Sequence, residues 1–434
     1  MSGPDPKAIR ADPSVLAYAA DRPAPTAGRS SPFSQRSFRF QWPADLAVSW
    51  AFEMETLVLG WYVLIETGSV VWLTAFGSLQ FTGTLISPLF GVAGDRLGHR
   101  TVLSAMRAAY VLLSLCLAVL ALTGQLNPLA VFVVAAFSGL VRPSDIGVRN
   151  ALIAATVPPA QLAGAIGVER VSMDSARVIG ALSGAALVAA LGMGPAYVVV
   201  VGLYLTSLLL TFGIREPARP GEARAKASLL STWRELGEGV AYARATPALL
   251  AALWLACLAN FAAYPLSGGL LPHVARDVYG LDRTGLGTLV ACFAGGALLG
   301  SLLLSLRGVG ARPARVMLLA AGLWFAVLLA FAQAETALAG MVLLLLAGFI
   351  QSFCMVPMQV LLLRITAAGL RGRVMGLRML AIYGLPVGLL LAGFGIARLG
   401  FAATATLYAG FGLLATAAIA WRWRAALWRM GEAR

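Results

Sequence analysis

Charged residues are scarce in this sequence. They make up 12% of its 434 residues, whereas hydrophobic residues make up 59% and the mean hydropathy is +0.82. A water-soluble domain of this length could not bury so much apolar surface, so the composition excludes an ordinary soluble enzyme or binding domain. The surplus apolar surface must face lipid, where only helices and closed barrels satisfy every backbone hydrogen bond.

Lysine, cysteine and histidine are rarer still, and each shortage excludes a class of site. In an ATP-binding phosphate loop the lysine directly follows a glycine. Neither of the two lysines here, Lys7 and Lys226, does so. The four cysteines lie inside apolar runs without metal-ligand spacing, and His99 and His273 fall on opposite sides of the predicted membrane. We therefore expect no ATPase site, no disulfide, no metal and no cofactor.

Long apolar runs rich in leucine and alanine fill most of the chain. A helix needs about 20 apolar residues to cross a bilayer, and the runs lack the period-two alternation of barrel strands. We predict an all-α polytopic membrane protein with twelve transmembrane helices in two six-helix bundles. The predicted spans are residues 44–65, 69–93, 101–122, 128–149, 161–190, 194–214, 248–272, 285–306, 315–334, 337–364, 373–398 and 401–422.

A polar connection divides these spans into two halves. The predicted parts are a disordered tail rich in Pro, Ser and Ala at 1–38, a first bundle at 39–214, a linker at 215–247, a second bundle at 248–423 and a short tail at 424–434. Within the linker, apolar residues at helical spacing (Leu229, Leu230, Trp233, Leu236 and Val240) predict an amphipathic helix on the membrane surface. A plain tether between the halves is the alternative.

Basic residues gather on one side of the predicted membrane. When both termini are placed in the cytoplasm, most of the 33 Lys and Arg residues lie in cytoplasmic segments, and only Arg276, Arg283 and Arg398 lie in outer ones. A net charge of +14 spread over loops in this way favours anionic lipid heads as partners and disfavours nucleic acid. We predict a monomeric, multi-pass protein of the inner (plasma) membrane with both termini cytoplasmic.

The polar stretch GVAGDRLGHR, residues 91–100, interrupts the apolar sequence between the second and third predicted spans. Its glycines allow a tight turn, and Gly91 is expected to permit close approach of a neighbouring helix. Asp95 at the membrane edge can pair with an arginine or with the N-terminal end of a helix, and such a contact can form and break. We expect a gating loop here, formed by Gly91, Asp95, Arg96, Gly98 and Arg100.

This stretch resembles the loop signature of the major facilitator superfamily, which reads Gly, three residues, Asp, Arg, one residue, Gly, a basic residue and Arg. His99 stands where that family usually has Arg or Lys. Residues 60–81 and 370–395 resemble helix regions of the branch that contains enterobactin exporters and macrolide efflux proteins, and the resemblance covers about residues 36–425. It implies export of small molecules, and a latch between Asp95 and the start of the span after Arg373.

Charged side chains inside the spans of the first half are candidates for proton coupling. A charge near the bilayer centre costs about 2.5–3.5 kcal/mol even on a lenient scale, so each needs a partner or water. Spacings of three and four residues place Arg142, Asp145 and Arg149 on one helix face, and the same holds for a second trio on the next helix. The full set is Glu53, Glu55, Arg107, Arg142, Asp145, Arg149, Glu169, Arg170, Asp174 and Arg177.

Two interpretations of these charges stay open. In the first, one or more of Glu53, Glu55, Glu169 and Asp174 takes up and releases a proton as the halves rock, because its surroundings change with the motion. In the second, the charges form a static ion-pair network. Glu53 and Glu55 are two residues apart and therefore lie on different faces of their helix.

The second half has no acidic residue inside its predicted spans. Polar and aromatic residues there are the candidates for the substrate cavity: Asn260, Phe261, Tyr264, Gln351, Met355, Gln359 and Tyr383. Together, these features predict a secondary transporter that exports a small organic molecule, siderophore or drug-like, in exchange for protons by alternating access. The alternatives are an importer of a small metabolite, a membrane-embedded lipid-handling enzyme that uses the buried acids as acid and base, and a sensor or scaffold that transports nothing.

Overall fold

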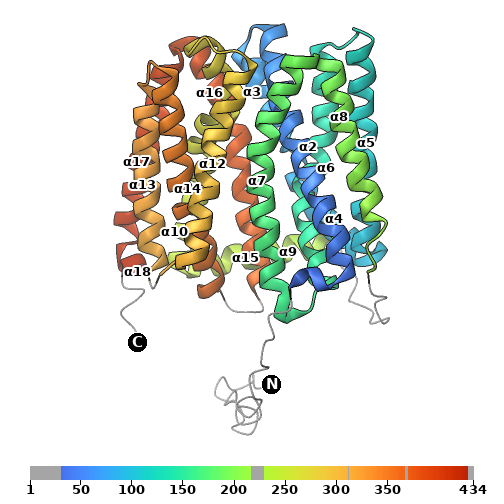
Figure 1. Ribbon diagram of the computed structural model, residues 1–434. Helices are drawn as coiled ribbons and strands as arrows, with labels where there is room; N and C mark the ends of the chain where they lie inside the picture. Colours follow the sequence, from blue (N-terminus) through green and yellow to red (C-terminus); the bar gives the residue numbers. More distant parts are fainter. Residues whose placement is uncertain (1–30, 217–228, 311, 367–369, 429–434) are drawn as a thin grey trace, which may run out of the picture.

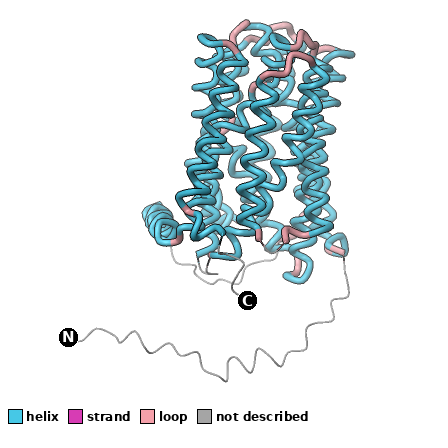
Figure 2. Tube along the Cα trace, turned by 90° about the vertical axis from the view of Figure 1, so that its left-hand side faces the viewer, coloured by secondary structure: helices cyan, strands magenta, loops and turns pink. Residues whose placement is uncertain are grey.

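The computed structural model describes residues 31–216, 229–310, 312–366 and 370–428 (Figure 1). All regular structure in these ranges is helical. Figure 2 shows the long helices running from one end of the bundle to the other, with the loops gathered at the two ends. The described chain begins and finishes at the same end of the bundle, which we call the terminal end (Figure 1).

The first half contains six spans. A short 3-10 turn, Pro32–Ser34, precedes them. The helices are α2 (Arg36–Thr67), α3 (Val70–Leu79), α4 (Ser87–Leu97), α5 (His99–Leu122), α6 (Pro128–Thr156), α7 (Pro159–Leu191) and α8 (Met193–Thr211). The short 3-10 turn η2 (Thr82–Ile86) separates α3 from α4, and the two helices form one span bent by 48°.

The second half follows helix α9 (Leu229–Ala245), which lies across the terminal end in Figure 1. Its first span begins with α10 (Pro247–Leu258) and continues through η3 (Ala259–Ala263), η4 (Pro265–Gly269), α11 (Leu271–His273) and η5 (Val274–Val278). The other elements are α12 (Arg283–Arg307), α13 (Pro313–Ala332), α14 (Ala337–Ile365), α15 (Arg371–Leu380), η7 (Ala381–Tyr383), α16 (Gly384–Leu399), α17 (Phe401–Arg422) and α18 (Arg424–Trp428).

The predicted all-α membrane fold is confirmed. In the described residues, eleven helices are long and apolar enough to cross a bilayer, and the bent α3–α4 pair supplies a twelfth span. Exposed leucine, valine and phenylalanine side chains cover the outside of the helices, as lipid contact requires.

The first helix begins at Arg36, earlier than the predicted span at residue 44 and inside the end of the predicted tail. The first turns of α2 carry polar residues, and two of their side chains are hydrogen-bonded to distant segments of the chain. The Ser37 hydroxyl donates to the Arg215 carbonyl over 2.9 Å, and Gln41 donates to the Arg149 carbonyl over 3.1 Å. Polar contacts between distant segments therefore extend this helix beyond its apolar run.

Most of the predicted gating loop is helical. Helix α4 continues to Leu97, α5 begins at His99, and Gly98 alone, with φ of +90°, breaks the helical path. The close approach expected at Gly91 is absent, since a Cβ there would meet no described atom within 4 Å. It is found at Gly94, where a Cβ would lie 2.8 Å from Cδ2 of His99.

The two halves meet along α3 with α16 and along α7 with α12. The Ser78 hydroxyl of α3 donates to the Pro386 carbonyl over 3.0 Å. At the end away from the chain termini, Arg276 donates to the Leu64 carbonyl over 2.7 Å and Arg283 donates to the Val188 carbonyl over 3.2 Å. These contacts hold the halves together at the end opposite the terminal end.

Glycine packing inside the second half gives a direct test of the fold. A Cβ on Gly296 of α12 would collide with the backbone of Leu345 on α14, whereas a Cβ on the adjacent Gly295 would meet no described atom within 4 Å. We expect Gly296→Ala to destabilise the protein by about 1–3 kcal/mol, and Gly295→Ala to leave it unchanged or slightly more stable. Melting temperatures in detergent measure both effects, and equal values for the two variants would contradict this packing.

Candidate functional site

A set of five charged residues lies buried inside the first half. Arg149 of α6 bonds Asp145 one turn earlier on the same helix. Its guanidinium also lies 3.4 Å from the Glu169 carboxylate of α7 and 3.8 Å from that of Asp45 on α2. Arg107 of α5 bonds Asp45 from the other side. We call these five residues the acid–arginine cluster.

The acid–arginine cluster has three carboxyl groups but only two guanidinium groups. No more than 6% of any of the five side chains is exposed. A net charge in such a place is unfavourable, because neither water nor counter-ions reach it. One proton on one of the carboxyls makes the cluster neutral.

Glu169 is the acid that the cluster holds least tightly. It has a single ion-pair contact, 3.4 Å from Arg149, whereas Asp45 and Asp145 each have a shorter bond to an arginine. Each of the three acids has an oxygen without a hydrogen-bond partner among the described residues: Oδ2 of Asp45, Oδ1 of Asp145 and Oε2 of Glu169. The longer ion pair therefore singles out Glu169, because a proton is most easily accommodated on the most weakly paired carboxyl.

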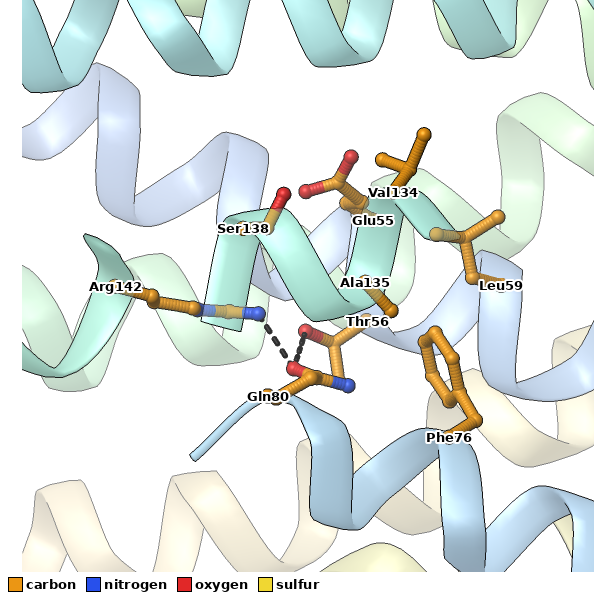
Figure 3. A pocket seen from close by; sticks show the side chains of 9 residues that line it. All are labelled: Glu55, Thr56, Leu59, Phe76, Gln80, Val134, Ala135, Ser138 and Arg142. Carbon is orange, nitrogen blue, oxygen red and sulfur yellow. Dashed lines mark hydrogen bonds between the residues drawn. The ribbon is translucent and has the colours of Figure 1, made fainter. Parts of the chain in front are cut away.

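Glu55 occupies a separate pocket. Its buried carboxylate accepts a 2.7 Å hydrogen bond from the Tyr204 hydroxyl of α8. Glu55 and Arg142 both line a small cavity between α2, α3 and α6 (Figure 3). Figure 3 also shows Arg142 and Thr56 directed at the side-chain oxygen of Gln80, over 2.5 Å and 3.3 Å. The guanidinium of Arg142 lies over the Phe52 ring, 4.3 Å from its centroid, and the cation–π contact helps to fix it.

The second predicted trio, Arg170, Asp174 and Arg177, lies on α7, which packs against both α2 of the first half and α12 of the second. Arg170 donates to Asp174 over 3.1 Å, and Ser301 of α12 lies 3.4 Å from the same carboxylate. Arg177 donates to Glu53 of α2 over 3.3 Å. Glu53 and Glu55 thus take different partners on different faces of α2. These pairs are only partly buried, with 52% of the Arg170 side chain and 34% of the Arg177 side chain exposed.

The structure brings together two of the predicted cavity residues. Gln351 of α14 donates to the Tyr264 hydroxyl over 2.8 Å. Tyr264 stands between the π-helical turns Ala259–Ala263 and Pro265–Gly269. Such turns are frequent at functional sites.

The other predicted cavity residues are less closely associated. Asn260 donates to its own helix at the Ala256 carbonyl, and Phe261 stacks on Tyr408 of α17 with ring centroids 5.7 Å apart. Met355 and Tyr383 are half-buried, and Gln359 is exposed. The place of these five residues in a cavity stays a prediction.

A family model described as the Major Facilitator Superfamily matches residues 47–386. The chain belongs to this superfamily. Its members are transporters, and the chain is accordingly a membrane transporter and not an enzyme, so the lipid-handling alternative is set aside. No significant match is found among curated protein sequences.

Solved structures of other transporters share the superfamily fold. The peptide-transporter-family (POT) protein PepTSo is 13% identical with a TM-score of 0.70, over 91% of this chain and 99% of that one. The human organic anion transporter MFSD10 is 17% identical with a TM-score of 0.64, over 88% and 99%. A D-xylose-proton symporter is 12% identical with a TM-score of 0.64, over 88% and 96%. At these identities the likeness shows the fold alone.

In this superfamily member the α4–α5 junction is tied to the end of the first half. The Glu216 carboxylate accepts the backbone N–H groups of His99 and Arg100 over 3.2 Å and 2.9 Å, and it also lies 3.2 Å from Nδ1 of His99. Partial burial by itself would raise the pKa of the Glu216 carboxyl, but the N–H groups of Arg100 and His99 lower that pKa below its ordinary value.

The structure gives contacts for three of the residues expected to form the gate, Asp95, Arg100 and Arg373. Asp95 lies 3.9 Å from Nε2 of His99, and Arg373 of α15 pairs with Glu238 of α9 over 2.7 Å. Arg100 donates to the Phe212 carbonyl over 3.0 Å. Arg96 lies in the last turn of α4. The latch between Asp95 and the start of α15 stays a prediction.

Sequence reasoning missed Asp45, Gln80 and Glu216. Asp45 stood at the edge of the predicted span, where an aspartate suggests the membrane surface; the earlier start of α2 at Arg36 places it inside the bundle. The sequence did contain a signal for it, because Asp45 is a charged residue inside the predicted span 44–65 and a charge there needs a partner. Glu216 lay in the linker, and its role as a cap for α5 depends on a contact between segments more than a hundred residues apart.

Glu216 should make stability depend on pH. Because its folded pKa is lowered, its contribution is complete above the ordinary glutamate pKa of 4.5 and is lost as the pH falls through the lowered value. We expect Glu216→Gln to lower the melting temperature at neutral pH and to match the unmodified protein in acid well below the lowered folded pKa of Glu216. Glu335→Gln, in an exposed loop, is the control. A difference that persists unchanged in strong acid would contradict the assignment.

Proposed function

We propose that this superfamily member is a secondary transporter that exports a small organic molecule in exchange for protons, by alternating access between its two halves. The acid–arginine cluster is the observation that carries the proposal. Three buried acids share two arginines, so the cluster is neutral only when it holds a proton. A site with this charge balance can gain and release one proton.

Glu169 is the proton carrier in this mechanism. It lies on α7, which packs against α12 of the second half, so a movement of the halves changes its surroundings. When α7 shifts and water reaches Glu169, the ionised form becomes favourable and the proton leaves. When the cluster closes again, a proton is needed to restore neutrality. Protonation and rocking are thereby coupled.

Export is the direction that we favour. The likeness of residues 60–81 and 370–395 to enterobactin exporters and macrolide efflux proteins supports it, and a catechol siderophore or drug-like compound is the corresponding substrate. Import is the competing direction, since one structure of the same fold is titled a D-xylose-proton symporter. Both directions use the same proton site, so they are separated by a flux measurement.

The excess acid in the cluster predicts opposite effects of two substitutions on stability. Glu169→Gln leaves two acids with two arginines, so we expect an unchanged or higher melting temperature. Arg149→Gln leaves three acids with one arginine and should cost about 3–5 kcal/mol. Melting temperatures of the purified protein at neutral pH test this. Equal destabilisation by both variants would support a static network instead.

Vesicle assays can measure proton release and substrate movement separately. Everted membrane vesicles that carry the protein should release internal protons when dihydroxybenzoate or erythromycin is added outside, as recorded by a trapped pH-sensitive dye. We expect Glu169→Gln to abolish this proton release while labelled substrate still exchanges across the membrane without a gradient, because glutamine mimics the protonated acid. Glu335→Gln is the control.

Two results would count against this proposal. Proton release that survives in Glu169→Gln would remove Glu169 from the mechanism. Accumulation of substrate by right-side-out vesicles under an inward proton gradient, with none in everted vesicles, would show an importer.

A further inference from the structure

Two arginines of the second half bond to the first half at the end opposite the terminal end, which we call the far end. Arg276 of η5 donates from Nη1 to the Leu64 carbonyl of α2 over 2.7 Å. Arg283, the first residue of α12, donates from Nη1 to the Val188 carbonyl of α7 over 3.2 Å. Each of these bonds therefore crosses from one half of the protein to the other.

The two acceptors occupy the same place in their helices. The Leu64 carbonyl also accepts the N–H of Gly68 over 3.0 Å, and the Val188 carbonyl accepts the N–H of Gly192 over 3.1 Å. Both glycines end their helix with a positive φ, of +63° and +83°. The carbonyl groups of a last turn carry the negative end of the helix dipole, and arginine side chains bind there favourably. The far ends of α2 and α7 thus offer two matching sites for a cation.

Asp277 holds Arg276 in its position. One carboxylate oxygen, Oδ1, accepts a 2.7 Å hydrogen bond from Nε of Arg276, and the other, Oδ2, lies 2.6 Å from Nδ1 of His273. All three side chains are mostly buried. Because the donors of a guanidinium have fixed directions in one plane, a bond at Nε also sets the direction of Nη1, which reaches Leu64. Asp277 is therefore a positioning residue for the bond between the halves.

Close helix packing accompanies the two arginine bonds. A Cβ on Gly287 of α12 would lie 2.6 Å from the Cβ of Ala185 on α7, and one on Gly393 of α16 would lie 2.1 Å from Oγ1 of Thr74 on α3. Contact between apolar surfaces has no preferred direction, whereas a charged hydrogen bond has a defined partner and length. The arginine bonds therefore specify the closed arrangement of the halves at the far end.

We propose that Arg276 and Arg283 form an arginine clasp that keeps the far end closed, and that both arginines must leave the ends of α2 and α7 when this end opens during transport. Asp277 contributes by orienting Arg276. This inference rests on the alternating access of the proposed function, and it names the residues that stabilise one of its two states.

Hydrogen–deuterium exchange of the purified full-length protein in lipid nanodiscs, read by mass spectrometry, tests the arginine clasp without substrate or a pH gradient. We expect Arg276→Gln and Arg283→Gln each to speed amide exchange at the far end, in residues 64–70 and 188–194, by about tenfold, as loss of a charged hydrogen bond does. Exchange at the terminal end, in residues 94–101 and 153–160, should slow, because that end closes when the far end opens. Simple loss of stability would instead speed exchange at both ends.

Conservative variants and a matched control locate the effect. Arg398→Gln removes another far-end arginine, from the exposed last turn of α16, and should exchange as the unmodified protein does. Arg276→Lys keeps the charge but loses the planar donor set, so its far end should exchange more slowly than that of Arg276→Gln. It also serves if the glutamine variant does not fold. Asp277→Asn should speed far-end exchange by itself and add nothing to Arg276→Gln, because it acts through Arg276.

Unchanged far-end exchange in both glutamine variants would overturn the arginine clasp, and so would faster exchange at both ends. Neither result affects the transport proposal, because Glu169 is not involved in this measurement. Conversely, opposite changes at the two ends of a protein that moves no substrate in either vesicle orientation would overturn the proposed function and leave the arginine clasp standing.

Discussion

The contact of the Arg149 guanidinium with three carboxyl groups is the interaction on which the first half depends. It joins Asp45 of α2, Asp145 of α6 and Glu169 of α7 through one side chain. Apolar packing cannot specify this arrangement alone, because lipid tails are as apolar as leucine side chains. The buried charges fix which faces of the helices meet, and their imbalance creates a place for a proton.

Helix α7 connects the two charge sets of the protein. Glu169 lies against the acid–arginine cluster, while Asp174, further along the same helix, lies 3.4 Å from Ser301 of the second half. The cluster has one acid more than it has arginines. A movement of α7 therefore changes the surroundings of the proton site and the contacts with the second half at once, which is a physical basis for coupling proton movement to substrate movement.

Apolar runs and residue spacing predicted the membrane spans and the separation of Glu53 from Glu55, because these depend on span length and helix period alone. The partners could not be predicted in this way. Asp45 reaches Arg107 and Arg149 across three helices, and Tyr264, which stands between two π-helical turns, meets Gln351 of another helix. Asn260 and Phe261, on the same span, face elsewhere. Local pattern gives the face of a helix, and tertiary packing decides what that face meets.

The central claim is that the acid–arginine cluster holds one proton at neutral pH. Infrared spectroscopy of the protein in lipid measures this most directly. A protonated carboxyl has a carbonyl band that shifts in heavy water, whereas a carboxylate lacks that band. Because Glu55 is a second buried carboxyl, the assignment comes from the difference between variants. We predict a protonated-carboxyl band at neutral pH that is lost in Glu169→Gln and persists in Glu335→Gln. A spectrum that Glu169→Gln leaves unchanged would contradict the account.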